Sequence, residues 1–183
     1  MTNDDQRRIR ELIERLGRIS AAEEWGDDLN PTQWTALSYL ARANRFSRSP
    51  SHVADFMAAT RGTVSQTLKS LARKGFVTEI RSAEDRRSIS YSLTEKGARL
   101  IARTRTIEEA VPDLGGAEAA ALRAGLEALA RAALRRRGYK SFGVCETCVH
   151  HVRQAGGAYC VLLNLPIAPD DMTRICHEHA ISA

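Results

Sequence analysis

The chain has 183 residues, of which 43% are hydrophobic and 27% are charged, and its net charge is +5. No apolar run approaches the ~20 residues of a membrane-spanning helix, and the first ten residues are too polar for a signal peptide, so we expect a cytoplasmic protein and no membrane contact. Residues 140–183 hold three basic and four acidic residues, so the positive net charge of the chain comes from residues 1–139. A basic region of this kind is expected where a protein binds a polyanion.

Residues 4–24 are predicted to form an amphipathic helix. Its apolar residues recur with the helical period and make one stripe: Ile9, Leu12, Ile13, Leu16 and Ile19. This pattern fits both a helix that faces the core of its own chain and a helix that packs against a second subunit.

Three further helices are predicted next, and each has a recognisable start. The Asn-Pro pair at 30–31 and the Ser-Pro pair at 49–50 combine a capping side chain with a proline in the first helical position, and Thr60 caps the third helix. We expect the first of these helices to end near Phe46 and the third to end at Gly75, where glycine accepts a left-handed conformation.

Two short stretches with alternating hydrophobicity follow, at residues 76–80 and 89–93, and they predict two strands. The segment between them is polar and basic, so we expect a β-hairpin with a charged tip. Thr94 caps a helix that should continue to about Val111, and a last helix is expected over residues 117–137. That last helix carries leucines at heptad-like spacing: Leu122, Leu126 and Leu129.

Helices followed by a basic hairpin predict a winged helix-turn-helix, within a fold that is mainly α (α+β). The helix after Thr60 carries side chains that bond base edges and phosphates, and arginines of the hairpin can reach phosphates or the minor groove. The candidate DNA-binding residues are Arg61, Thr63, Ser65, Gln66, Lys69, Arg81, Arg86 and Arg87. A solvated helix face and a polar loop would contain the same residue types, but their combination with the hairpin favours double-stranded DNA as the partner.

Three stretches of this region resemble the MarR family of winged-helix transcriptional regulators. They are LNPTQWTALSYL at 29–40, RGTVSQTLKSLARKGFV at 61–77, and EDRR at 84–87 followed by LTEKG at 93–97. The resemblance covers about residues 5–137. It implies an obligate homodimer with long intertwined dimerisation helices, which reads a palindromic operator with two recognition helices. It also implies structural and phosphate-contacting roles at the wing tip for Asp85 and for Arg86 or Arg87.

In the implied dimer, the apolar stripe of the first helix and the leucine row of the last helix face the partner subunit. Many family members bind small aromatic or phenolic effectors, but no residue before Gly138 identifies such a ligand here. We therefore expect residues 1–138 to form a DNA-binding and dimerisation domain of a transcriptional regulator, in particular a repressor, rather than an enzyme.

The chain departs from the family after Gly138, because family members usually end with the long dimerisation helix. All four cysteines lie in this added segment with the spacing C-x2-C-x11-C-x15-C: Cys145, Cys148, Cys160 and Cys176. Residues 139–183 contain few large apolar side chains, so we expect a small module that a metal ion or cluster stabilises through these four ligands.

Three kinds of cysteine site are compatible with this spacing. A C-x2-C pair followed by two single cysteines resembles the ligand order of high-potential iron–sulfur proteins and of small cluster-bearing subunits of some glycyl-radical enzymes. We therefore favour an iron–sulfur cluster that senses redox state, oxygen or iron and acts on the dimer helices to tune DNA affinity. The alternatives are a structural four-cysteine zinc site in a regulator with a small-molecule effector, and a metal-free thiol switch.

The histidines near the cysteines are expected to be exposed or to lie behind the ligands: His150, His151, His177 and His179. A zinc-dependent enzyme is disfavoured because the sequence has no matching acid–base constellation and no typical catalytic zinc motif. An architectural DNA-binding protein, whose added segment only strengthens the dimer, stays open.

Overall fold

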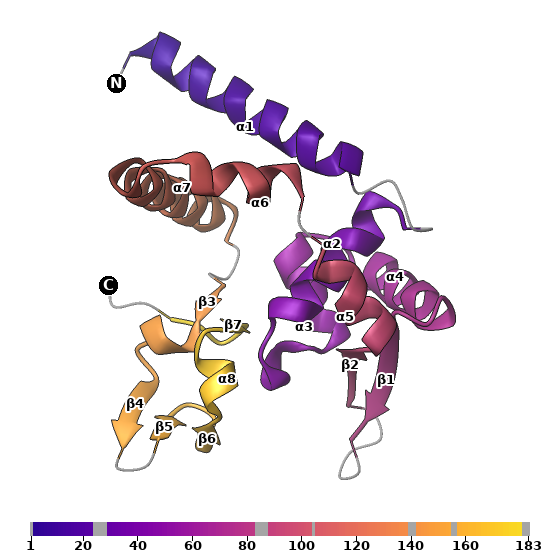
Figure 1. Cartoon of the computed structure of the whole chain (residues 1–183). Coiled ribbons are helices and arrows are strands. Elements are labelled where there is room, and N and C mark those ends of the chain that lie inside the picture. The colour runs from indigo at the N-terminus through magenta and orange to yellow at the C-terminus, as the bar shows by residue number, and fades with distance from the viewer. Residues whose placement is uncertain are drawn as a thin grey trace.

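The computed structural model describes residues 2–23, 29–82, 88–103, 105–138, 142–154 and 157–180. Its fold is mainly helical with a small β-wing, as predicted, and Figure 1 shows two long helices, a winged helix-turn-helix and a small β-rich module. Among the described residues, no helix is both long enough and apolar enough to cross a membrane.

The winged helix-turn-helix begins with three helices: α2 (Pro31–Arg42), α3 (Pro50–Met57) and α4 (Arg61–Arg73). The wing strands β1 (Val77–Arg81) and β2 (Ile89–Leu93) pair antiparallel, and α5 (Glu95–Ile101) follows. The predicted caps are present, because a side-chain oxygen accepts a bond from a backbone N–H in the first turn of each helix. These capping residues are Asn30, Ser49, Thr60 and Thr94. Local sequence thus determines where the helices begin.

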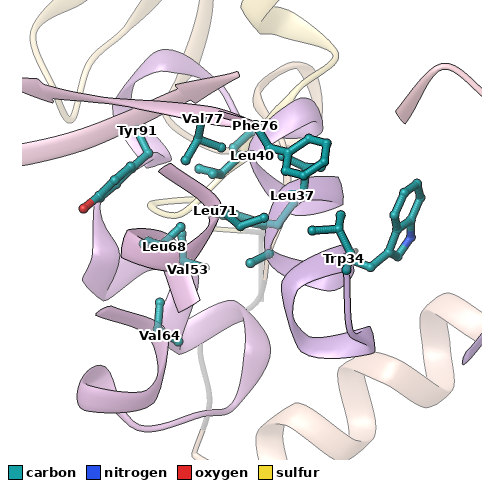
Figure 2. Packing of buried hydrophobic residues seen from close by; sticks show 14 of the residues in the cluster. Trp34, Leu37, Leu40, Val53, Val64, Leu68, Leu71, Phe76, Val77 and Tyr91 are labelled. Atoms are coloured by element: carbon teal, nitrogen blue, oxygen red, sulfur yellow. The ribbon is translucent and has the colours of Figure 1, made fainter. Parts of the chain in front are cut away.

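Apolar side chains from these elements meet in one core (Figure 2). Several large side chains are completely buried there: Leu37, Leu40, Val53, Val64, Leu68 and Leu71. Tyr39 is also fully buried, and its hydroxyl donates to the carbonyl of Ser47 at 2.7 Å. Since the core-facing positions of α4 follow the helical period, its opposite face is left towards solvent.

The Leu-Thr-Glu-Lys-Gly segment joins the wing to α5 through close contacts. The hydroxyl of Thr94 donates to the carbonyl of Gly75 at 2.7 Å, and the Thr94 N–H donates to the carbonyl of Phe76 at 3.0 Å. A Cβ atom on Gly97 would overlap that same Phe76 carbonyl. Glycine at this position therefore lets α5 approach the base of the wing.

Two long helices, α1 (Asn3–Glu23) and α7 (Gly116–Arg137), lie outside this core (Figure 1). The short helices α6 (Thr106–Ala110) and η2 (Val111–Asp113) precede α7. No residue of α1 is buried. The apolar rows of both helices are exposed in the single chain: Ile9, Leu12, Ile13, Leu16 and Ile19 on α1, and Leu122, Leu126 and Leu129 on α7.

The helix predicted to reach Phe46 ends earlier, at Arg42. Ala43 is extended and forms an isolated parallel bridge with Ile175 of the added segment. A short 3-10 helix, η1 (Arg45–Ser47), follows it. The pairing with a distant part of the chain overrides the local helical preference here.

The helix predicted from Thr94 to about Val111 is divided into α5 and α6. Arg105 is extended, and its guanidinium lies 3.5 Å from the centre of the Trp34 ring. The same guanidinium donates to the carbonyl of Glu23, and the Thr106 N–H donates to the Glu23 carboxylate at 3.2 Å. These contacts with α1 and α2 break the helix at a point that local sequence does not mark.

The added segment contains several short elements: β3 (Gly143–Val144), η3 (Cys145–Thr147), β4 (His151–Gln154), β5 (Gly157–Cys160), β6 (Leu165–Ile167), α8 (Pro169–Met172) and β7 (Ile175–Cys176). Strands β4, β5 and β6 form an antiparallel sheet in that order, and β3 pairs antiparallel with β7. We call residues 142–180 the cysteine module. It lies beside the winged helix in Figure 1.

Candidate functional site

Helix α4, the predicted recognition helix, presents its polar face away from the core. Arg61, Thr63, Gln66 and Lys69 are exposed, and Ser65 is half-buried. The predicted DNA-binding residues of this helix thus lie on solvent-facing positions, where a docked duplex can reach them.

Polar contacts fix α4 against α2. The Gln33 side-chain NH₂ group donates to the Ser70 hydroxyl at 3.0 Å, and the Lys74 ammonium donates to the side-chain oxygen Oε1 of Gln33 at 3.1 Å. At the other end of α4, the Thr63 hydroxyl lies 2.8 Å from the Thr60 hydroxyl, which caps the helix. Thr63 therefore has a capping contact of its own besides any role at DNA.

Strand β1 of the wing contains an ion pair between its middle and its outer end, which the sequence did not indicate. Arg81 contacts the Glu79 carboxylate at 2.7 Å, and the same carboxylate accepts a bond from the Tyr91 hydroxyl at 2.9 Å. Burial and the hydrogen bond to Glu79 raise the pKa of Tyr91 to about 12. Asp85, Arg86 and Arg87 lie outside the described residues.

The cysteine module has a small core built largely from its own thiols. Its buried members are Cys145, Ala158, Cys160, Ile167 and Cys176, and all four cysteines of the module are free. Cys148 is half-buried. The fold thus brings three of the four predicted ligands into one core, although they are separated by up to 31 positions in the sequence.

Hydrogen-bond donors contact the sulfur atoms of Cys145, Cys148 and Cys176. The Asn44 side-chain amide donates to Cys145 Sγ at 3.2 Å, and the Ala180 N–H donates to Cys148 Sγ at 3.4 Å. Cys145 and Cys176 hydrogen-bond to each other, which lowers the pKa of the Cys176 thiol and raises that of Cys145. Donors directed at sulfur favour its thiolate form, which is the form that binds metals.

This donor set suits a metal ion or an iron–sulfur cluster in its chemistry, since buried thiols with N–H donors stabilise thiolate ligands. Across the described residues, however, no group of three or more His, Cys, Asp or Glu side chains is placed to hold a metal ion. Three of the cysteines gather in one core without forming a coordination site among the described residues, so the four-cysteine site stays a prediction.

The nearby histidines are buried or half-buried: His177 is buried, and His150, His151 and His179 are half-buried. His177 is buried, its ring stacks on that of His52 at 3.6 Å, and its Nδ1 lies 3.1 Å from the Glu178 carboxylate. His151 faces Cys160 across β4 and β5, so the two side chains lie on the same face of the sheet. The buried Nε2 of His151 has no hydrogen-bond partner within the described part of the chain.

The cysteine module docks on the α2–α3 connection, which we define as residues 43–49. The Asn44 N–H donates to the carbonyl of Ile175 at 2.9 Å, and the His177 N–H donates to the Ser47 hydroxyl at 2.8 Å. Asn44 and Ser47 are essentially unexposed. Since Asn44 also donates to Cys145, it contacts both the backbone of the module and the sulfur atom of Cys145.

Charged contacts extend this docking surface. The Arg45 side chain donates to the carbonyl of Pro166 at 2.8 Å and lies 3.7 Å from the Asp171 carboxylate. From the module, the Arg174 guanidinium donates to the carbonyl of Ala41 at 3.2 Å. The sequence does not indicate these contacts, because a partner more than 100 positions away leaves no local pattern.

The comparisons with known proteins concern the winged-helix part. The MarR family model matches residues 27–88. FabT of Streptococcus pneumoniae, whose crystal structure is in complex with DNA, is 25% identical, with a TM-score of 0.56 over 69% of this chain and 95% of that one. A search among curated proteins finds none that matches.

Two further solved structures share the fold. The transcriptional regulator SlyA is 22% identical, with a TM-score of 0.56 over 73% of this chain and 96% of that one. A MarR protein from Peptoclostridium difficile is 15% identical, with a TM-score of 0.57 over 74% and 91%. Together with the family match, these likenesses show a MarR-type winged-helix fold.

Proposed function

We propose that this protein is a DNA-binding transcriptional regulator of the MarR type that represses genes as a homodimer on a palindromic operator. The observation that carries the proposal is α4, whose apolar face is packed in the winged-helix core while Arg61, Gln66 and Lys69 are exposed. The match of residues 27–88 to the MarR family supports it, as does the likeness to FabT, whose crystal structure is in complex with DNA.

A homodimer is proposed because α1 and α7 leave their apolar rows uncovered. On α1, Leu12 and Leu16 are 44% and 46% exposed, and Leu126 on α7 is 46% exposed. Continuous apolar rows of this kind mark association surfaces, and a second copy would cover both helices at once. The substitution pair Leu12→Glu and Leu16→Glu should yield monomers in light scattering coupled to size-exclusion chromatography.

DNA binding is tested by selecting operators from random duplexes and titrating the selected DNA in fluorescence anisotropy. Arg61→Ala should weaken binding while the dimer persists, because it removes a charged side chain from the recognition helix. The matched control is Arg99→Ala, an exposed arginine of α5 that pairs with Glu95. Equal effects of both changes, or a wild type without sequence preference, would contradict the proposal; the latter would favour an architectural role.

We also propose that Cys145, Cys148, Cys160 and Cys176 hold an iron–sulfur cluster, with zinc as the alternative. When bound, such a cluster would supply sensitivity to redox state, oxygen or iron supply. The donors around the sulfur atoms support a thiolate-bound group. The module contacts the α2–α3 connection, through Asn44 at Cys145 and Ser47 at His177. The sequence had instead predicted that the module acts on the dimer helices.

This second proposal is tested by purifying the protein without oxygen, measuring its metal content and visible spectrum, and comparing operator affinity before and after exposure to air. Bound iron with a visible absorption that air bleaches, together with an altered affinity, is the expected result. A colourless protein with one zinc per chain and unchanged affinity would instead support a structural zinc site and a separate small-molecule effector.

A further inference from the structure

The four cysteine sulfur atoms differ in the hydrogen bonds that they accept. Cys145 accepts a bond from a side-chain amide, Cys148 from a backbone N–H, and Cys176 from a serine hydroxyl. Cys160 is buried in the same core, but within the residues that the structure describes no group donates to its sulfur. One member of the set thus lacks the kind of contact that the other three have.

His151 lies directly opposite this cysteine. His151 on β4 and Cys160 on β5 are partners in the antiparallel sheet, so their side chains project from the same face. This face is the inner one, because Ala158 and Ile167 share it and are buried. The Cβ atoms of such partners lie about 4.5–5.5 Å apart, a separation that an imidazole ring can span.

One ring nitrogen of His151 is buried and unsatisfied. Its Nε2 atom has no hydrogen-bond partner within the described residues, although native folds rarely leave a buried polar atom in this state. The backbone N–H of His151 donates to the carbonyl of Cys148 at 3.0 Å, so the ring follows directly on the turn that carries the C-x2-C pair. An unsatisfied nitrogen and the sulfur of Cys160 therefore share one face above the thiol core.

We propose that His151 is a positioning residue for Cys160, and that its Nε2–H donates a hydrogen bond to the Cys160 sulfur when the four cysteines hold their metal ion or cluster. This inference rests on the proposed cysteine site. Four thiolates already complete the coordination of a zinc ion or a cluster, so the histidine is not needed as a ligand. Donors of this kind orient a ligand and stabilise its thiolate form, and their loss typically costs about 10–100-fold in metal affinity.

The test uses full-length protein purified without oxygen and challenged with an excess of EDTA, and it measures the rate of metal loss. His151→Phe keeps a ring of similar size but removes the donor, so loss should be at least about tenfold faster than in the wild type. His151→Gln keeps an N–H group at a similar reach and should restore most of the wild-type rate. The matched control is His150→Phe, which changes the neighbouring half-buried histidine and should leave the rate unchanged.

These variants separate hydrogen bonding from packing. Metal loss from His151→Phe no faster than from His150→Phe would overturn the proposal, and so would equal rates for His151→Phe and His151→Gln. If the phenylalanine variant does not fold, His151→Asn takes its place, because its shorter amide does not reach the position of Nε2 and should lose metal as fast.

The reduction potential gives a second measurement if the wild type holds an iron–sulfur cluster. Hydrogen bonds to the sulfur atoms help to set this potential, so His151→Phe should lower it and His151→Gln should return it towards the wild-type value. An unchanged potential in His151→Phe would overturn the proposal, and with zinc the EDTA comparison alone decides. A wild type without any bound metal would overturn the proposed cysteine site as well, whereas a loaded wild type that is indifferent to His151 would overturn this inference alone.

Discussion

The winged helix and the cysteine module have cores of different kinds. The winged helix buries large aliphatic side chains such as Leu37, Leu68 and Leu71 completely. The module buries three cysteines with Ala158 and Ile167, while Val161 and Leu162 are about half exposed. Burial of apolar surface is the main force that stabilises a fold, so the module has much less of it for its size.

The two parts therefore depend on different sources of stability. The winged helix is stabilised by its own packing. The module depends on its contacts with the α2–α3 connection, and we expect the proposed metal or cluster to add to its stability, as in small domains that a metal completes. A change in the cysteines is therefore expected to affect the module first and the winged helix through their shared contacts.

The largest effect is expected from Leu68→Ala, which should lower the free energy of unfolding by about 2–5 kcal/mol because it opens a cavity in the winged-helix core. The measurement is urea unfolding followed by circular dichroism. Leu162→Ala in the module makes the same change at an exposed position and should cost no more than about 0.5 kcal/mol. Similar losses of unfolding free energy in both variants would show that the two parts do not differ in how far apolar packing stabilises them.

Cys160→Ala should destabilise the module and spare the winged helix. It removes a buried thiol from the small core, so amide exchange should accelerate across residues 142–180, while α2 to α5 stay protected. Hydrogen exchange followed by mass spectrometry reads both parts in one experiment. Unfolding of the winged helix together with the module would refute the two-part description.

Asn44→Ala should weaken the junction between the parts. It removes the donor to Cys145 at a fully buried position, at a cost of about 1–3 kcal/mol. Faster exchange is expected in β7 and in the α2–α3 connection. Gln154→Ala removes an exposed amide of the module and serves as the control; an equal change in that variant would exclude a specific role for Asn44.

The smallest effect is expected at Arg81 of the wing, compared with Lys69 of the recognition helix α4. Lys69→Ala should reduce operator affinity at all salt concentrations and lower the slope of log affinity against log salt by about 1. Arg81→Ala should have a weaker effect, because Arg81 is already paired with Glu79. Anisotropy titrations at several salt concentrations distinguish the two, and a larger loss for Arg81→Ala would show that the ion pair opens on DNA.

Local sequence predicts the parts of this fold that local chemistry determines. Asn30, Ser49, Thr60 and Thr94 mark helix starts through bonds to nearby N–H groups, so these boundaries are confirmed. The predicted end of α2 was wrong because Ala43 pairs with Ile175, which is far away in the sequence.

In the candidate sites too, local sequence predicts what local chemistry determines and does not predict what tertiary contacts determine. The outward face of α4 could be predicted because helical period alone separates Gln66 and Lys69 from Leu68. Arg81 could be recognised as basic but not as paired, since Glu79 lies on the same strand and the ion pair depends on side-chain conformation. Asn44 and Ser47 left no signal as contacts of the cysteines, because tertiary packing alone brings them together.

We expect the state of the cysteine module to set the DNA affinity of the winged helix. The most direct measurement is the affinity of protein purified without oxygen for its selected operator, before and after metal removal with a chelator. The account predicts a change of at least about tenfold, equivalent to about 1.4 kcal/mol of coupling, and a smaller change in Asn44→Ala. Equal affinities for the metal-bound and metal-free wild-type protein would contradict it.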